Sequence, residues 1–298
     1  MLGKKVKFIY NPVAGDRSVI RYLDNFFKKF QSAGFKLEVF RSMEAGDFGR
    51  GLNDLDEEHK AIIIAGGDGS ASNIINIMQQ RNIELPLGII PTGTANDFAK
   101  YIGMSENIEK SIDTILNWNI KEVDIGRVNE RYFLNVCAGG IISNIAHRTE
   151  TEMKNRLGKV AYYLYGLKEL PNIKPMSLKI TTSQTEISGK FLAFFIFNSK
   201  DAGGFKNIAQ FAAIDDGVFD LIAVESANII KISSVIADLL QGKNIDNKNI
   251  VYIQDNYFKI EKIDVNKQTN HCDIDGEKGP EFPLEIQLLP KALKIISA

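Results

Sequence analysis

Residues 61–70 read Ala-Ile-Ile-Ile-Ala-Gly-Gly-Asp-Gly-Ser, and the interpretation of the whole chain starts from this stretch. The apolar run from Ile62 to Ile64 is typical of a buried strand. It breaks abruptly into glycines, and the apolar residues that follow, from Ile74 to Met78, return at helical spacing. The stretch therefore predicts a strand, a glycine turn and a helix.

The glycine turn is suited to binding an anion. Gly66, Gly67 and Gly69 lack the Cβ atoms that would hold a polyphosphate away from the backbone, and the turn opens onto a helix N-terminus. Asp68 would repel a phosphate directly, so its presence favours a divalent cation between carboxylate and phosphate. The dinucleotide fingerprint Gly-x-Gly-x-x-Gly is not matched, because Gly67 and Gly69 are followed by Ser72 at the position of the third glycine. The chain also has no Gly-x-x-x-x-Gly-Lys-[Ser/Thr] loop. The turn predicts a metal–nucleotide complex of another type.

The first part of the chain alternates between short apolar runs and helical patterns. Strands are predicted at residues 6–10, 37–40, 61–65 and 87–90, and a helix with one broad apolar face after the first strand. The apolar residues of that face are Val19, Ile20, Leu23, Phe26, Phe27 and Phe30. Alternating strands and helices predict a parallel sheet covered by helices, with ligands at the carboxyl ends of the strands.

The pattern changes after Lys121. Period-2 segments predict strands at residues 123–128, 131–136, 177–182, 190–198, 218–224, 250–254 and 258–265. Helices are predicted around residues 159–170 and 228–241, and the domain boundary between Trp118 and Val128. The final strands, 284–289 and 293–296, are expected to return to the sheet of the first domain. The second half is therefore predicted to be mainly an antiparallel β domain.

Composition agrees with a two-domain globular enzyme. The chain has 298 residues, of which 44% are hydrophobic, so it can fill two cores. Its formal net charge of −1 offers no general attraction to nucleic acid or anionic lipid. No stretch is long and apolar enough for a membrane span, no secretory leader precedes the first strand, and there are only two cysteines. We expect a cytoplasmic protein whose membrane contacts are local.

Two motifs together carry a family resemblance. The turn at residues 66–70 and the segment Pro-Thr-Gly-Thr-Ala-Asn-Asp-Phe-Ala at 91–99 resemble the diacylglycerol kinase catalytic domain family. Its soluble bacterial lipid kinases carry Gly-Gly-Asp-Gly-[Thr/Ser] and Gly-Thr-x-Asn-Asp-[Phe/Leu]-Ala. The resemblance implies a nucleotide-binding α/β domain over residues 1–122, joined by 288–298, with a doubly wound, mostly parallel, NAD kinase/phosphofructokinase-like sheet. It also implies a β-sandwich domain for lipid binding and catalysis over residues 123–287.

The same resemblance implies the activity and the partners. It predicts ATP- and Mg²⁺-dependent phosphorylation of a lipid hydroxyl, with diacylglycerol converted to phosphatidic acid. The lipid would be taken at the bilayer surface by a peripherally associated protein, with no nucleic acid partner and with a homodimer as the family expectation. The sequence does not choose among diacylglycerol, phosphatidylglycerol, a sphingoid base and a polyprenol as acceptor.

Nucleotide-binding residues follow from the resemblance position by position. They are Asn11, Ser42, Gly66, Gly67, Asp68, Gly69, Ser70, Ala71, Ser72, Thr94, Asn96 and Asp97. Asp97 is implied to be a second carboxylate that holds the magnesium hydration shell. From the residues alone, other interpretations stay open: a strand-ending turn at Asn11, a helix cap at Ser42, and a helix start capped by Asn96 or Asp97.

Two acidic turns in the second half also carry predictions. Residues 214–220, Ile-Asp-Asp-Gly-Val-Phe-Asp, fit a hairpin turn, whereas the resemblance implies a magnesium site made by Asp216 with backbone carbonyls near Ala213 and Val218. Residues 272–277, Cys-Asp-Ile-Asp-Gly-Glu, do not fit an EF-hand, because non-carboxylate residues would stand at its first and last positions. By itself this segment is an acidic turn. The resemblance implies that Glu277 is the general base and that Asp275 supports the magnesium and base network.

Two other functions compete with the lipid kinase. NAD kinases share the Gly-Gly-Asp-Gly-[Thr/Ser] turn and a similar architecture, although the loop at residues 93–99 points away from them. A non-catalytic nucleotide- or lipid-binding descendant is the other alternative. The retained carboxylates Asp68, Asp97, Asp216 and Glu277 argue against it, because a sensor could bind without a base.

Overall fold

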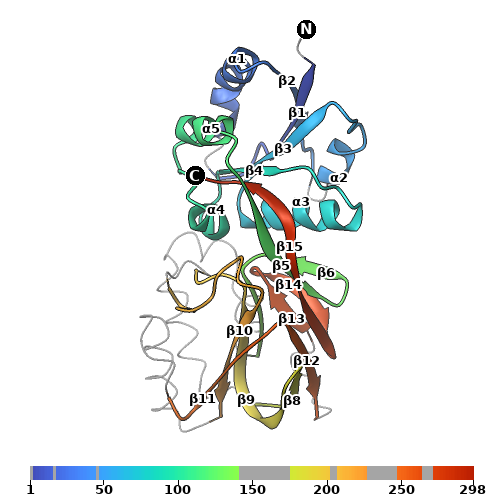
Figure 1. Ribbon diagram of the computed structural model, residues 1–298, viewed down its shortest axis with the longest axis vertical. Coiled ribbons are helices and arrows are strands. Elements are labelled where there is room, and N and C mark those ends of the chain that lie inside the picture. The colour runs from blue at the N-terminus through green and yellow to red at the C-terminus, as the bar shows by residue number, and fades with distance from the viewer. Residues whose placement is uncertain are drawn as a thin grey trace. The chain divides into compact units, whose positions relative to one another are not determined.

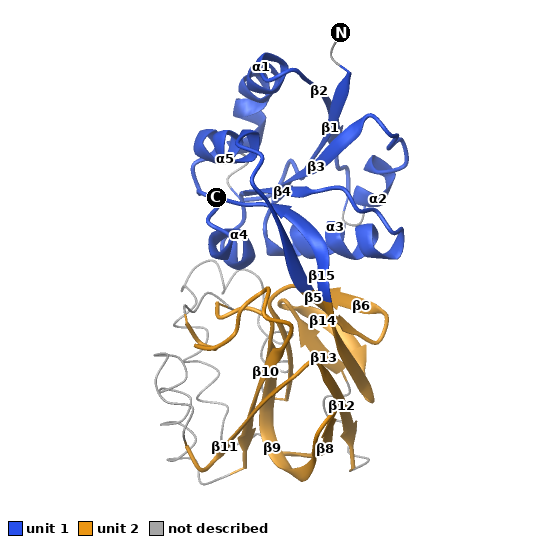
Figure 2. Cartoon of the chain, viewed as in Figure 1, with its two compact units in different colours: residues 1–124, 290–298 blue, residues 125–289 orange. Residues whose placement is uncertain are grey.

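The computed structural model describes residues 3–15, 18–44, 47–140, 175–201, 207–226, 247–263 and 271–298. The chain divides into two compact units (Figure 2): unit 1 is Met1–Asp124 with Pro290–Ala298, and unit 2 is Ile125–Leu289. The helices predicted around residues 159–170 and 228–241 lie outside the described residues. The functional assignment of the two predicted domains stays a prediction.

Unit 1 alternates strands and helices along the chain (Figure 1). Its elements are β1 (Lys4–Tyr10), the 3₁₀ helix η1 (Ser18–Tyr22), α1 (Leu23–Ser32), β2 (Phe35–Arg41), α2 (Phe48–Gly51), β3 (His59–Gly66), α3 (Asp68–Gln80), β4 (Leu87–Pro91), α4 (Asp97–Tyr101) and α5 (Ile108–Leu116). Strand β5 (Ile120–Val128) leads into unit 2, and the end of β15 (Leu284–Ile296) returns to unit 1.

The sheet of unit 1 is parallel throughout its described strands. The strand order is β15-β4-β3-β1-β2, and each neighbouring pair is parallel. Residues 62–64 of β3 are fully buried, as an apolar strand covered on both faces requires. The connection after β1 leads to β2 at one edge of the sheet, whereas the connection after β3 leads to β4 in the opposite direction. Right-handed crossovers therefore place α1 and α3 on opposite faces of the sheet, as Figure 1 shows. The predicted doubly wound parallel sheet is confirmed, and its topological switch point lies between β1 and β3.

The helical segment after β1 differs in detail from the predicted one. It begins as a 3₁₀ turn and continues as α1, with Val19, Phe26 and Phe30 buried. Ile20 is 48% exposed and Phe27 is 37% exposed, so the expectation of one broad apolar face containing both was wrong. The 3₁₀ turn accounts for Ile20, because its period of three residues moves side chains off the stripe that an α-helix buries. Phe27 lies inside α1, next to the buried Phe26, and is only partly covered.

Unit 2 is built of antiparallel strands. Beyond β5 these are β6 (Arg131–Phe133), β7 (Val136–Gly140), β8 (Met176–Thr182), β9 (Glu186–Phe197), β10 (Phe219–Glu225), β11 (Ile250–Asp255), β12 (Tyr257–Lys262), β13 (His271–Ile274), β14 (Glu277–Glu281) and the first part of β15. All their mutual pairings are antiparallel. Strand β8 alternates buried and half-buried residues as a strand with one face on a core should. The predicted antiparallel second half is confirmed.

Two predicted strand boundaries were wrong. The strand expected over residues 131–136 is interrupted between β6 and β7, because the amides of residues 134–136 donate to the carboxylate of Asp275 instead of to a ladder partner. The two strands expected at the C-terminus are one strand, β15. Lys291 has a left-handed backbone at the place of the expected break, and its amide donates to Asp124 Oδ1 at 2.7 Å.

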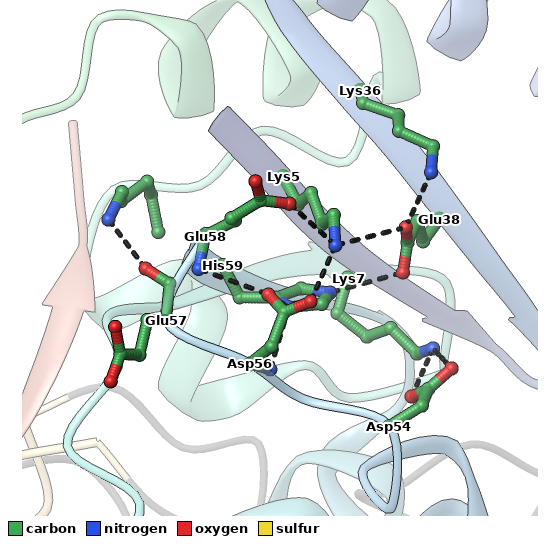
Figure 3. Close-up of polar contacts among 10 residues, drawn as sticks. Lys5, Lys7, Lys36, Glu38, Asp54, Asp56, Glu57, Glu58 and His59 are labelled. Atoms are coloured by element: carbon green, nitrogen blue, oxygen red, sulfur yellow. Dashed lines mark hydrogen bonds and ion pairs between the residues drawn. The ribbon is translucent and has the colours of Figure 1, made fainter. Parts of the chain in front are cut away.

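Charged side chains gather at the amino ends of β1, β2 and β3, the end of the sheet away from the glycine turn (Figure 3). Lys5 Nζ lies 2.7 Å from Glu58 Oε2 and also pairs with Asp56 and Glu38. The buried imidazole of His59 lies between two of these carboxylates, with Nδ1 2.8 Å from Asp56 and Nε2 3.2 Å from Glu38. This cluster is separate from the glycine motifs, which follow the carboxyl ends of the strands.

We expect this cluster to give unit 1 an acid-sensitive component of stability. The hydrogen bond from Lys5 lowers the pKa of Asp56 from 3.8 to about 2. A carboxylate with a lowered folded-state pKa stabilises the fold above its unfolded pKa, and this contribution is lost as pH falls from about 4 toward 2. The melting temperature of the wild type should therefore fall more steeply over this interval than that of Lys5→Met. Equal slopes in thermal melts of the two proteins would contradict the prediction.

Candidate functional site

The loops at the carboxyl ends of the unit 1 strands are joined by backbone hydrogen bonds. The amide of Asn11, just after β1, donates to Ala65 O at 3.2 Å, and the amide of Thr92, just after β4, donates to Gly66 O at 3.0 Å. The amide of Ser42, just after β2, donates to Tyr10 O at 3.0 Å. The four loops chosen from the sequence therefore begin side by side along one edge of the sheet, beside the switch point where α/β sheets bind ligands.

The two glycine motifs touch through their backbones. A Cβ atom on Gly93 would lie 2.4 Å from Gly67 Cα, and one on Gly67 would lie 3.1 Å from Gly93 Cα. A Cβ atom on Gly66 would lie 2.3 Å from the Cβ of Ser70. Only glycine permits this approach, which brings the loop after β4 against the start of α3.

Asn96 holds the second loop in shape. Its side-chain Oδ1 accepts the amide of Gly93 at 2.9 Å, and its Nδ2 donates to Gly93 O at 2.8 Å. Its backbone is left-handed, and its side chain makes no capping bond to α4, so the capping alternative is wrong for Asn96. A predicted contact between Asn96 and a nucleotide stays a prediction.

Asp68 and Asp97 both stand in the first turn of a helix at this edge. Asp68 begins α3, and its Oδ2 accepts the amide of Asn96 at 2.7 Å. Asp97 begins α4 and directly follows Asn96. The hydrogen bond between Asn96 and Asp68 therefore brings the two acidic residues close together. Both residues are half-buried. Two carboxylates beside half-buried glycines are a hard-oxygen donor set that fits Mg²⁺ bridged to phosphate.

The remaining predicted nucleotide residues differ in exposure. Thr94 is exposed, and Gly69 and Ser70 are half-buried at the start of α3, so their polar groups can be reached from solvent. The side chains of Ala71 and Ser72 are buried in the same helix, and the Ala71 amide already donates to Gly67 O. Asn11 uses its Oδ1 to accept the amide of Val13 at 3.0 Å, which also forms the strand-ending turn that the sequence allowed.

Thr92 is a further candidate for this site that the sequence did not single out. Its side chain is 8% exposed, and its Oγ1 has no hydrogen-bond partner among the described residues. A buried hydroxyl without a partner, one residue before the glycine contact, is a place where a ligand or water oxygen fits. The motif at residues 91–99 contains this threonine, but nothing in its spacing separates the role of Thr92 from that of Thr94.

In unit 2 the predicted catalytic acids lie in one tight hairpin. Asp275 and Gly276 join β13 to β14 with φ values of 52° and 87°, the left-handed pair that a two-residue type I′ turn requires. The Asp275 carboxylate accepts the amides of Leu134, Asn135 and Val136 at 2.7, 2.9 and 3.0 Å. Asp275 thus fastens the hairpin to the connection between β6 and β7.

Glu277 follows this hairpin turn and has an accessible side chain. It is the first residue of β14, and its side chain is 46% exposed. Arg131 of β6 lies nearby, with its Nη2 3.7 Å from Glu277 Oε2. The anchored turn therefore presents a carboxylate to solvent from a rigid support, the arrangement that a general base needs.

The second acidic turn precedes β10. Asp216 and Val218 flank Gly217, whose φ of 79° makes the turn tight, and Asp216 Oδ1 accepts the Val218 amide at 3.2 Å. Asp216 is exposed, and Ala213 is half-buried. No group of three or more His, Cys, Asp or Glu side chains within the described ranges is arranged to hold a metal ion, so a cation here would rely on backbone carbonyls as well.

The fold and the glycine loops define an α/β unit with a parallel sheet, followed by an antiparallel β unit. Residues 5–128 match the model of the family described as "Diacylglycerol kinase catalytic domain". Residues 135–297 match the "YegS C-terminal NAD kinase beta sandwich-like domain". The chain belongs to the diacylglycerol kinase catalytic domain family, and the predicted β-sandwich class of its second half is confirmed.

Individual relatives agree over nearly the full length. The diacylglycerol kinase of Bacillus subtilis (strain 168) is 31% identical over 98% of this chain and 96% of its own. That of Staphylococcus carnosus (strain TM300) is 29% identical over 98% of this chain and 94% of its own. The crystal structure of a putative diacylglycerol kinase from Bacillus anthracis str. Sterne superposes with a TM-score of 0.85 at 27% identity, covering 99% of this chain and 95% of that one.

No described helix has both the length and the apolar character needed to cross a bilayer.

Proposed function

We propose that this protein is an ATP- and Mg²⁺-dependent lipid kinase that phosphorylates the hydroxyl of diacylglycerol to form phosphatidic acid. The observation that carries the proposal is the backbone contact between Gly67 and Gly93 at the carboxyl ends of β3 and β4, next to the switch point of a parallel sheet, with Asp68 beside it. Membership of the diacylglycerol kinase catalytic domain family and the names of the relatives support the substrate class.

The nucleotide would bind at the strand ends of unit 1. The half-buried residues from Gly67 to Ser70 would offer backbone amides to its phosphates, aided by the positive dipole end of the 13-residue helix α3. Thr94 would add an exposed hydroxyl, and Asn11 and Ser42 line the neighbouring strand ends. Asp68 and Asp97 would hold Mg²⁺, which, when bound, would neutralise charge on the phosphates.

Glu277 would act on the acceptor. Its carboxylate would take the proton of the lipid hydroxyl while the hydroxyl oxygen bonds to the γ-phosphorus and the bond from that phosphorus to the β,γ-bridging oxygen breaks. The products would be a phosphorylated lipid and ADP. Because phosphoryl transfer depends mostly on positioning and charge stabilisation, Asp275 would contribute by fixing the turn that carries Glu277.

The chemistry of the lipid acceptor also indicates where the enzyme would meet its substrate. A hydroxyl beneath an apolar tail is presented at a bilayer surface, so we propose peripheral membrane association of a cytoplasmic enzyme. A homodimer is proposed on the family resemblance alone.

A transfer assay tests the function. Labelled ATP and Mg²⁺ are incubated with detergent-dispersed diacylglycerol, phosphatidylglycerol or sphingosine, with NAD in a parallel reaction. We expect label in an organic-soluble product that comigrates with phosphatidic acid. Label on NAD would replace the proposal with an NAD kinase, and ATP binding without transfer to any acceptor would favour the non-catalytic alternative.

A further inference from the structure

A buried carboxylate in unit 2 takes no part in the proposed reaction. Asp220, the second residue of β10, is 1% exposed. Its Oδ1 accepts hydrogen bonds from the Tyr252 hydroxyl and from Gln254 Nε2, the latter at 3.1 Å. Its Oδ2 is buried and has no hydrogen-bond partner among the described residues. Tyr252 and Gln254 therefore both donate to Oδ1 of Asp220.

A buried carboxylate oxygen without a hydrogen-bond partner destabilises the fold unless a proton or a cation balances its charge. Burial, followed by the bond to Asp220, raises the pKa of Tyr252, so the phenol remains the donor in their hydrogen bond. Asp220 follows the last residue of the 213–218 turn by two positions, so the chain itself keeps its carboxylate close to that turn.

Strand alternation determines which way Asp220 faces. Phe219 and Leu221 point into the main core of unit 2, so Asp220 points to the opposite face of β10, with Ile222 and Val224. On that face Ile222 and Val224 pack against Ala209 and Ala212. The segment that packs on this face of β10 therefore leads directly into the turn at residues 213–218.

We propose that Asp220 is a further carboxylate of the cation site at the 213–218 turn, with Oδ2 directed to the cation or to a water bound to it. The site would combine Asp220 and Asp216 with the backbone carbonyls of Ala213 and Val218, an all-oxygen set suited to Mg²⁺. Tyr252 and Gln254 leave Oδ2 available by occupying Oδ1, so they orient the carboxylate for this purpose. The cation would link the covering segment to the β10–β11 pair.

The role of Asp220 rests on the proposed cation site at the 213–218 turn. It does not depend on phosphoryl transfer. Its residues all belong to unit 2, whereas Asp68 and Asp97 belong to unit 1. Cation binding at the turn can therefore be measured without nucleotide or lipid, and a failed kinase assay would not decide it.

The test compares thermal stability after EDTA treatment and dialysis with stability in a series of Mg²⁺ concentrations, without nucleotide. Because a ligand that binds only the folded state stabilises it, the wild-type melting temperature should rise with Mg²⁺. Asp220→Asn keeps the shape of the side chain, and its apparent Mg²⁺ affinity should be roughly 10- to 100-fold weaker. Asp216→Asn should behave similarly. Calorimetric titration of the same proteins gives the dissociation constants directly.

A matched variant separates the site from general charge effects. Asp215→Asn removes the adjacent exposed carboxylate and should keep the wild-type Mg²⁺ response. If the wild type shows no Mg²⁺ response, or if Asp220→Asn responds like the wild type, the proposal is overturned. In the second case Asp220 is a buried core acid that takes no part in cation binding.

Discussion

Replacing Glu277 by glutamine is expected to lower kcat for lipid phosphorylation by roughly 10²- to 10⁴-fold, the usual contribution of a general base. The amide cannot accept the hydroxyl proton at neutral pH. Stability should change little, because the side chain is 46% exposed and its ion pair with Arg131, at 3.7 Å, is a surface interaction. The measurement is steady-state transfer of labelled phosphate to diacylglycerol, accompanied by a thermal melt of each protein.

The matched control is Glu281→Gln. Glu281 lies on the same strand, β14, and is exposed, and a register shift in the β13–β14 pair separates its position from that of Glu277. This variant removes the same charge and should keep wild-type kcat. If both variants lose activity equally, the effect belongs to the charge of the strand; if neither does, Glu277 is not the base.

Replacing Asp275 by alanine is expected to destabilise unit 2 by about 2–4 kcal/mol, because three backbone amides lose a charged acceptor. Leu134 and Asn135, which donate two of these bonds at 2.7 and 2.9 Å, are almost completely buried, so water cannot replace the carboxylate freely. Activity would fall as a consequence of a loosened turn at Glu277. Urea unfolding followed by circular dichroism measures the loss of stability.

Hydrogen exchange distinguishes this structural role from a direct one. In Asp275→Ala the peptide covering residues 134–136 should lose protection, whereas Asp275→Asn, which keeps one acceptor oxygen, should lose less. The predicted supporting role in the magnesium and base network would instead give a variant with wild-type stability and exchange but with much lower kcat. That outcome would contradict the structural interpretation of Asp275.

Much of unit 1 could be predicted because its signals are local. The apolar run at residues 62–64 ends in glycines and resumes at helical spacing, and these neighbours along the chain are enough to define β3, the turn and α3. Alternation of such units implied a parallel sheet with its loops at one edge. The amphipathic face after β1 was less well predicted, since a 3₁₀ turn changes the period without any mark in the sequence.

The candidate site was predicted as a set of motifs, but not as a set of contacts. Asp68 and Asn96 were selected from separate glycine-rich segments, and only the structure brings the Asn96 amide to 2.7 Å from Asp68 Oδ2. Gly93 appeared as one small residue among several, whereas the structure shows that a side chain there would collide with Gly67.

The sequence by itself determined the order of strands and helices, the positions of the glycine turns and the family, because each depends on residues close together in the chain. Only the tertiary structure decided what the acidic residues touch. Asp275 meets amides that are 139 to 141 residues away, and Asp220 meets Tyr252 across 32 residues. Such partners are chosen by strand pairing and register, and a local pattern of polar and apolar residues specifies only the face on which a side chain stands.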